Sequence, residues 1–189
     1  IKSWNTFSIN SPSGSHKIRT ESFPYQSIDS GHYYKKINTS LSKNENIQFF
    51  RNISEIDTNN SFIFNSVPES TSDKSKLWQH FQGVEIEVEK DIFDDEIINL
   101  MDFNCDQRSS VHFFYTLPFT KNKALIETTW LSRFDNDSLK DYDFQIEKYI
   151  KETLGIHKYK INFKEKGAIP LFYSRSTKKV NKINIGSAG

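Results

Sequence analysis

The chain has 189 residues, enough for one substantial domain or two small ones. Its 25 basic and 24 acidic residues nearly cancel and form no dense basic run, which argues against a nucleic-acid-binding protein. A single cysteine, Cys105, excludes a disulfide framework and a cysteine-rich metal site, and no apolar stretch reaches the ~18 residues of a membrane-spanning helix.

The two ends of the sequence look like interior parts of a longer polypeptide. The chain begins with Ile1 rather than methionine, shows no signal peptide, and stops at Gly186-Ser187-Ala188-Gly189 directly after an apolar run. Glycine in such a position usually opens a turn. We therefore expect both ends to be cuts within a longer protein.

The first part of the chain predicts short elements separated by polar segments. Residues 30–42 have the apolar spacing of an amphipathic helix, with Ser30 as its predicted N-cap. The polar segment 66–76 is the predicted internal boundary. Short strands are expected at 3–8, 16–20, 47–50 and 62–64.

The middle of the chain predicts consecutive antiparallel strands. Val84, Ile86 and Val88 alternate with three glutamates, which is typical of a half-buried strand with a solvated outer face. Three more strands, separated by short turns, are expected at 97–104, 111–119 and 124–131. Consecutive strands with short links favour an antiparallel meander.

A second helix is predicted over residues 138–154, with Gly155 at the position of a C′ glycine. Its apolar stripe consists of Leu139, Tyr142, Ile146, Tyr149, Ile150 and Leu154. Strands at 159–163 and 180–185 complete the chain. The order of elements favours an α+β fold, or an α/β protein with an inserted antiparallel sheet.

Several kinds of active site have no pattern in this sequence. Neither the five histidines nor the acidic residues have the spacing of metal ligands, so no metal site is expected. A nucleophilic serine would lack its G-x-S-x-G turn, and no glycine-rich phosphate loop is present.

Three carboxylates remain as candidates for acid–base chemistry. Glu127 lies among apolar and β-branched residues, where burial would raise its pKa and suit it to proton transfer; alternatively it faces solvent or pairs with Arg133. Asp102 follows Leu-Met and is alternatively a hydrogen-bonded structural acid. Glu165 precedes a predicted Gly-Ala-Ile-Pro turn and is alternatively an exposed loop charge.

The order of five segments resembles the flavin-dependent lycopene β-cyclases. That family has Q-x-F-x-G, M-D-x-x-x-x-Q, F-x-Y-x-L-P-F, I-E-D-T-x-x-S and E-x-G-x-L-P segments in this order. The matching segments begin here at Gln79, Met101, Phe113, Ile126 and Glu165. Trp4, Arg19 and Tyr25 match an earlier W…R…Y series, whereas Thr128 and Lys164 replace acidic residues of the family pattern.

The resemblance implies a p-hydroxybenzoate hydroxylase-like fold, in which a Rossmann flavin domain carries an antiparallel substrate-domain sheet. Residues 1–70 would then belong partly to the flavin domain, 71–165 to the substrate-binding domain, and 166–189 to the return into the flavin domain. The implied cofactor is reduced FAD, with Gly186 and Gly189 among its contacts. Most of its site, including the glycine-rich fingerprint, would lie outside this chain, so the fragment alone is expected to be inactive.

The implied reaction is the non-redox cyclisation of the linear ends of lycopene to β-ionone rings, an isomerase or intramolecular lyase activity. The implied catalytic residues are Glu127, Asp102 and Glu165. The implied substrate-binding residues are Phe113, Tyr115, Pro118, Thr129 and Trp130. Because lycopene dissolves only in membranes, a cytoplasmic enzyme in peripheral contact with a membrane is expected.

Two other classes of protein fit parts of the pattern. One is an FAD-dependent monooxygenase or isoprenoid reductase of the same fold, which would be a redox enzyme. The other is a non-catalytic lipid-binding module with an aromatic pocket. Exchanging Glu127 for glutamine separates them, because a cyclase should lose its product while still holding the polyene.

Overall fold

The computed structural model describes residues 1–58, 60–67, 73–172 and 180–186. The chain divides into two compact units. The larger unit comprises the described residues of 2–26 and 72–173, and the smaller comprises Ile1 and the described residues of 27–71 and 174–189. Helices and a large, mostly antiparallel sheet make this the mixed α+β fold that the sequence predicted.

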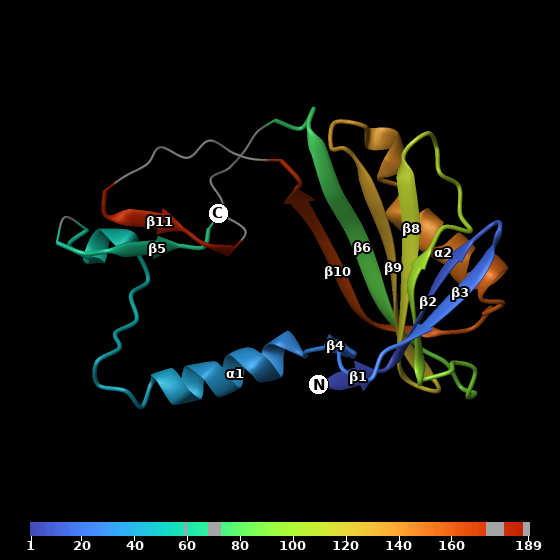
Figure 1. The fold of residues 1–189 in the computed structure, drawn as a ribbon, viewed down its shortest axis with the longest axis horizontal. Coiled ribbons are helices and arrows are strands. Elements are labelled where there is room, and N and C mark those ends of the chain that lie inside the picture. The colour runs from blue at the N-terminus through green and yellow to red at the C-terminus, as the bar shows by residue number, and fades with distance from the viewer. Residues whose placement is uncertain (59, 68–72, 173–179, 187–189) are drawn as a thin grey trace. The chain divides into compact units, whose positions relative to one another are not determined.

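A seven-stranded sheet forms the larger unit (Figure 1). In spatial order its strands are β10 (Lys160–Pro170), β6 (Leu77–Glu87), β9 (Lys123–Arg133), β8 (Val111–Thr120), β7 (Ile97–Asp102), β2 (Thr6–Ser11) and β3 (Gly14–Arg19). Neighbours are antiparallel except for β2 and β7, which are parallel. Three of the four strands of the predicted meander, β7, β8 and β9, are consecutive neighbours at the centre of the sheet. The first strand of that prediction, β6, lies beside β9 and β10 instead of beside β7, so the predicted order is wrong there.

Helix α2 (Tyr142–Lys148) packs against one face of this sheet (Figure 1). A 3-10 turn, η2 (Asp137–Leu139), precedes it, and a π-helical turn, η3 (Tyr149–Thr153), continues it. The predicted helix over 138–154 is thus three shorter pieces, and Gly155 follows at φ +68°, as a C′ glycine should. Its predicted apolar stripe is confirmed, because Ile146, Tyr149 and Ile150 are buried against β6, β8 and β9.

The opposite face of the sheet carries a second apolar cluster. Its centre is Trp4 of strand β1 (Lys2–Trp4), which pairs with β4 (Tyr25–Ser27) in a small two-stranded sheet. Trp4 is 1% exposed, packs with Leu117 and donates its indole N–H to the Pro118 carbonyl oxygen at 3.2 Å. This contact ties the N-terminal strands to the central sheet.

The smaller unit contains α1 (Ser30–Leu41), the 3-10 turn η1 (Ile53–Glu55), and a parallel pair made by β5 (Ile63–Asn65) and β11 (Lys182–Asn184). The N-cap of α1 is Asp29 rather than the predicted Ser30, since its carboxylate accepts the His32 N–H at 2.7 Å. No described helix in either unit is long and apolar enough to cross a membrane.

The predicted strand at 47–50 is wrong. These residues lie between a turn closed by Asn44 and the 3-10 turn that begins after Asn52, and they join no sheet. The turn predicted after Glu165 is also wrong, because β10 continues in register with β6 as far as Pro170. Strand pairing with β6 therefore outweighs the local turn signal of Gly167 and Pro170.

The two units differ from the sequence ranges predicted for domains. The predicted range 1–70 includes residues 2–26, but β2 pairs with β7 and so joins the large sheet. Residues 166–170 likewise stay with that sheet through β10. The predicted boundary segment 66–76 is only partly described, because residues 68–72 lie outside the described residues. The assignment of the units as flavin and substrate domains stays a prediction.

Candidate active site

Hydrogen bonds to α2 show which residues of β9 point to which face of the sheet. The hydroxyl of Thr128 and the indole N–H of Trp130 both donate to the Gln145 side-chain oxygen of α2, at 2.8 and 2.9 Å. Side chains alternate along a strand, so Glu127 and Thr129 point to the opposite face. Glu127 therefore lies on the same side of the sheet as the Trp4 cluster.

A row of four paired residues crosses that face. Glu127 of β9 is the register partner of Gly83 on β6 and of Tyr115 on β8. Gly83 is in turn the partner of Glu165 on β10. Directly paired residues project to the same side of a sheet, so Glu165 shares this face with Glu127.

Glu165 occupies the space above Gly83. A Cβ atom built at Gly83 would lie 3.0 Å from Glu165 Oε1 and 3.1 Å from its Cγ. The Glu165 side chain therefore lies over the backbone of β6, which separates its own strand from that of Glu127. The alternative of an exposed loop charge does not hold, because Glu165 is partly buried within β10.

The pKa of Glu127 lies well above that of an ordinary glutamate. Its pKa is raised to about 7, chiefly by burial and to a smaller extent by the nearby charge of Glu165. The Thr129 hydroxyl, which donates to Glu127 Oε1 at 2.7 Å, opposes this shift by stabilising the carboxylate. Burial also raises the pKa of Glu165. The pair can thus hold a proton at a pH where ordinary carboxylates are ionised.

Two tyrosines and the Trp4 cluster lie near Glu127. Burial raises the pKa of Tyr115 and of Tyr25, and the charge of Glu127 adds to both shifts. Tyr25 also packs on Trp4, with ring centroids 6.4 Å apart. Leu125, two residues before Glu127, packs against the same cluster. Tyr25 was not predicted as a site residue, although its place in the W…R…Y series was a usable signal.

The predicted substrate-binding residues divide between the two faces. Phe113, Tyr115 and Thr129 project to the Glu127 face by their register in β8 and β9. Trp130 does not, because it stacks on His112 at 3.8 Å beneath α2. Pro118 also belongs to the α2 face, since it pairs with the core residue Ala124.

Asp102 lies on the α2 face, away from Glu127 and Glu165. Its carboxylate accepts hydrogen bonds from the Tyr149 hydroxyl at 2.7 Å, the Asn99 amide at 3.1 Å and the Asn104 backbone N–H at 3.0 Å. A register irregularity in β7 turns both Asn99 and Asp102 toward Tyr149. The geometry favours the alternative of a buried, hydrogen-bonded structural acid.

Other polar groups of the larger unit form structural networks. Arg133 pairs with Asp135 at 2.7 Å, so the predicted alternative of a Glu127–Arg133 pair is not formed. His80 contacts the Tyr142 and Ser132 hydroxyls at 2.6 and 2.7 Å and is fully buried. Within the described residues, no group of histidine, cysteine and acidic side chains could hold a metal ion.

Gly186 lies two residues after the end of β11, in the smaller unit. Its φ of +56° favours glycine, and a Cβ built there would meet no atom within 4 Å. An uncovered glycine after a parallel strand is compatible with close approach of a dinucleotide phosphate to the backbone. Gly189, the other predicted cofactor contact, lies outside the described residues.

The chain is similar to known proteins in sequence pattern and in fold. The family model for "lycopene cyclase protein" matches residues 52–189. No curated protein matches the chain. The solved structure of a geranylgeranyl bacteriochlorophyll reductase-like protein from Thermoplasma acidophilum aligns with a TM-score of 0.58 and 9% identity. The alignment covers 99% of this chain but 55% of that one, so the chain spans about half its length. At this identity the likeness shows a shared fold alone.

Proposed function

Because the chain belongs to the lycopene cyclase family, we propose that it carries the proton-transfer site of a lycopene cyclase. The reaction is the non-redox closure of the linear ends of lycopene to β-ionone rings. One observation carries the proposal: Glu127 is partly buried on the sheet face of the Trp4 cluster, in one row with Glu165, with its pKa raised to about 7. A carboxylic acid that keeps its proton near neutral pH is what protonation of an alkene requires.

The proton inventory of the reaction balances without an oxidant. Glu127 donates its proton to a terminal double bond of the polyene, which leaves a tertiary carbocation. An internal double bond attacks this cation and closes the six-membered ring. Loss of a ring proton to a carboxylate then restores a neutral product with the same formula as the substrate. Glu165, whose charge acts on Glu127, is the proposed second carboxyl group for proton return or exchange.

The surroundings of Glu127 suit an uncharged polyene and a cationic intermediate. Leu117, Leu125 and Tyr115 offer apolar contact area around the carboxyl group. The faces of Tyr115 and Phe113 carry partial negative charge, which favours a nearby cation. A water-poor site also strengthens each electrostatic interaction within it.

Reduced FAD is the proposed cofactor, and when bound it supplies negative charge that stabilises the developing cation. Gly186 is the described residue proposed to meet it, since its backbone is uncovered and adopts a glycine-specific conformation. Gly189 is proposed as a second contact. The remaining contacts would come from parts of the protein outside this chain.

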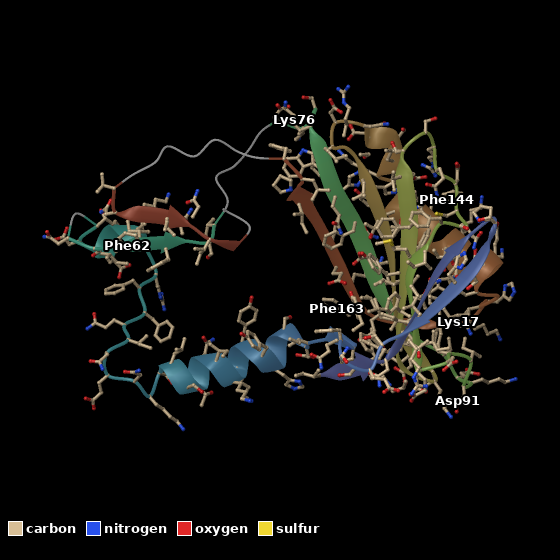
Figure 2. The ribbon with its side chains drawn as sticks, viewed as in Figure 1. Lys17, Phe62, Lys76, Asp91, Phe144 and Phe163 are labelled. Carbon is tan, nitrogen blue, oxygen red and sulfur yellow. The ribbon has the colours of Figure 1, made fainter. Side chains whose placement is uncertain are left out.

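Peripheral contact with a membrane is proposed because the substrate is insoluble in water. Two exposed aromatic side chains of the larger unit are suited to such contact: Phe163 on β10 and Phe144 on α2, 55% and 59% exposed (Figure 2). Phe163 pairs with Glu85, which lies on the same face, two residues beyond Gly83 of the Glu127 row. Phe163→Ser should weaken sedimentation of the protein with phospholipid vesicles more than Phe144→Ser does.

A redox enzyme of the same fold is the second candidate function. It is supported by the fold shared with a geranylgeranyl bacteriochlorophyll reductase-like protein. Such an enzyme would reduce or oxygenate an isoprenoid and would consume a nicotinamide cofactor. It has no need of a carboxyl group whose pKa is near 7, which is why the cyclase is preferred.

Expression of the longer protein that contains this chain, in cells that accumulate lycopene, tests the proposal. A cyclase should shift the pigment from red to yellow-orange, with products of unchanged mass. Glu127→Gln should abolish this shift while leaving polyene binding intact, and Glu152→Gln, at an exposed position on η3, is the matched control. A product that differs from lycopene by two hydrogens or one oxygen would instead establish the redox alternative.

A further inference from the structure

Gly83 stands out because its backbone does not require glycine. Its φ lies outside the left-handed region, which among the described glycines is reached only by Gly14, Gly155 and Gly186. An L residue can therefore adopt the same extended conformation in β6. The reason for glycine at this position must be space rather than backbone freedom.

The space above Gly83 is filled by the site itself. An added Cβ would lie 3.0 Å from Glu165 Oε1, 3.1 Å from Glu165 Cγ and 3.2 Å from Leu125 Cδ1. All three distances are shorter than ordinary van der Waals contact, so Glu165 and Leu125 would have to move. Leu125 belongs to the apolar cluster around Trp4 and has less freedom than a terminal carboxyl group.

We propose that Gly83 is a positioning residue, whose missing side chain lets the Glu165 carboxyl group lie across β6 and interact with Glu127. Strand β6 separates β10 from β9, so the two glutamates are not on neighbouring strands. Any larger residue at position 83 would form a ridge between them. A catalytic role for Glu127 and Glu165 rests on the proposed function, whereas their arrangement across β6 does not.

The groups that face Glu127 are few, so the effect of moving Glu165 can be isolated. They are Glu165 from β10, Tyr115 from β8, Tyr25 from β4 and the Thr129 hydroxyl from β9 itself. Burial raises the pKa of both tyrosines above the ordinary value of a phenol, so both are uncharged near neutral pH. Glu165 is thus the charged neighbour whose displacement should change the titration of Glu127.

The test is a titration of Glu127 in the chain of residues 1–189, followed by the carboxyl carbon signal in NMR spectra and assigned with Glu127→Gln. Glu165→Gln should lower the pKa of Glu127, because it removes a repelling charge. Gly83→Ala should lower it in the same direction and by no more than that amount. In the Glu165→Gln background, Gly83→Ala should cause no further lowering.

Gly167→Ala is the matched control. It adds a methyl group to an extended glycine on the same face, but its Cβ would meet the Phe81 ring at 2.5 Å rather than a carboxyl group. It should destabilise the fold without lowering the pKa of Glu127. Gly83→Val, with a side chain suited to strands, replaces Gly83→Ala if that substitution is absorbed by a small shift of Glu165.

Three results would overturn the proposal. They are an unchanged Glu127 titration in folded Gly83→Ala and Gly83→Val, an equal lowering by Gly167→Ala, and an unchanged titration in Glu165→Gln. Because none of these measurements uses lycopene, a negative cyclase assay would refute the proposed function and leave the carboxyl pair standing. A positive cyclase assay together with any of the three overturning results would support the cyclase proposal and refute the role of Gly83.

Discussion

Glu127→Gln should stabilise the folded protein at neutral pH, because a buried carboxyl group that must ionise opposes folding. Its folded-state pKa of about 7 lies above the ordinary value of 4.5. The unfolded chain thus loses its proton at lower pH than the folded chain. Stability associated with Glu127 is fully present below pH 4.5 and is lost as the pH rises toward 7.

The size of the effect follows from the shift. A difference of 2.5 units, from 4.5 to about 7, corresponds to a ceiling of about 3.4 kcal/mol at 1.36 kcal/mol per unit. Glu127 is partly exposed, so solvent screening reduces this, and we expect about 2 kcal/mol at pH 8. At pH 5 the difference should be below about 1 kcal/mol. Glutamine keeps the oxygen that accepts the Thr129 hydroxyl and is close in size.

Urea unfolding of both proteins at pH 5, 6, 7 and 8 measures this difference. Other titrating groups are common to the two proteins, so their contributions cancel when the free energies of unfolding are subtracted. The advantage of Glu127→Gln should grow steadily from pH 5 to pH 8. A constant difference across this range, or one that shrinks as the pH rises, would show that Glu127 does not keep its proton in the folded state.

Three further predictions concern the α2 face and the end of η3. Burial lowers the pKa of His80 and of His112 to about 4, so NMR spectra should show each imidazole neutral from pH 8 to pH 5. Acidification from pH 6.5 toward pH 4 should lower the free energy of unfolding by up to about 3 kcal/mol per histidine, measured by urea unfolding. Tyr149→Phe keeps the ring that stacks on Phe114 but removes a hydrogen-bond donor to buried Asp102, which should lower the free energy of unfolding by about 1–3 kcal/mol. An unchanged urea unfolding midpoint would contradict the structural role of Asp102. Gly155→Ala should cost about 1–2 kcal/mol through its φ of +68° alone, since no atom lies within 4 Å of the added Cβ, and calorimetry would show the loss as a lower Tm.

Local patterns in the sequence were sufficient for most elements of the larger unit. Alternation of apolar and polar residues at 84–88 placed part of β6, and the stripe from Leu139 to Leu154 marked the helical segment that covers the sheet. The same reasoning failed at residues 47–50, where an apolar run has no strand to pair with, and after Glu165, where pairing with β6 extends the strand.

The sequence alone made Glu127 a candidate, because an acid between apolar and β-branched residues predicts burial. Its partners depended on strand register, which joins residues 83, 127 and 165 although they are far apart along the chain. Register also decided that Asp102 and Trp130 belong to the α2 face. A shift of one residue moves a side chain to the other face of a sheet, and only the pairing of strands determines that choice.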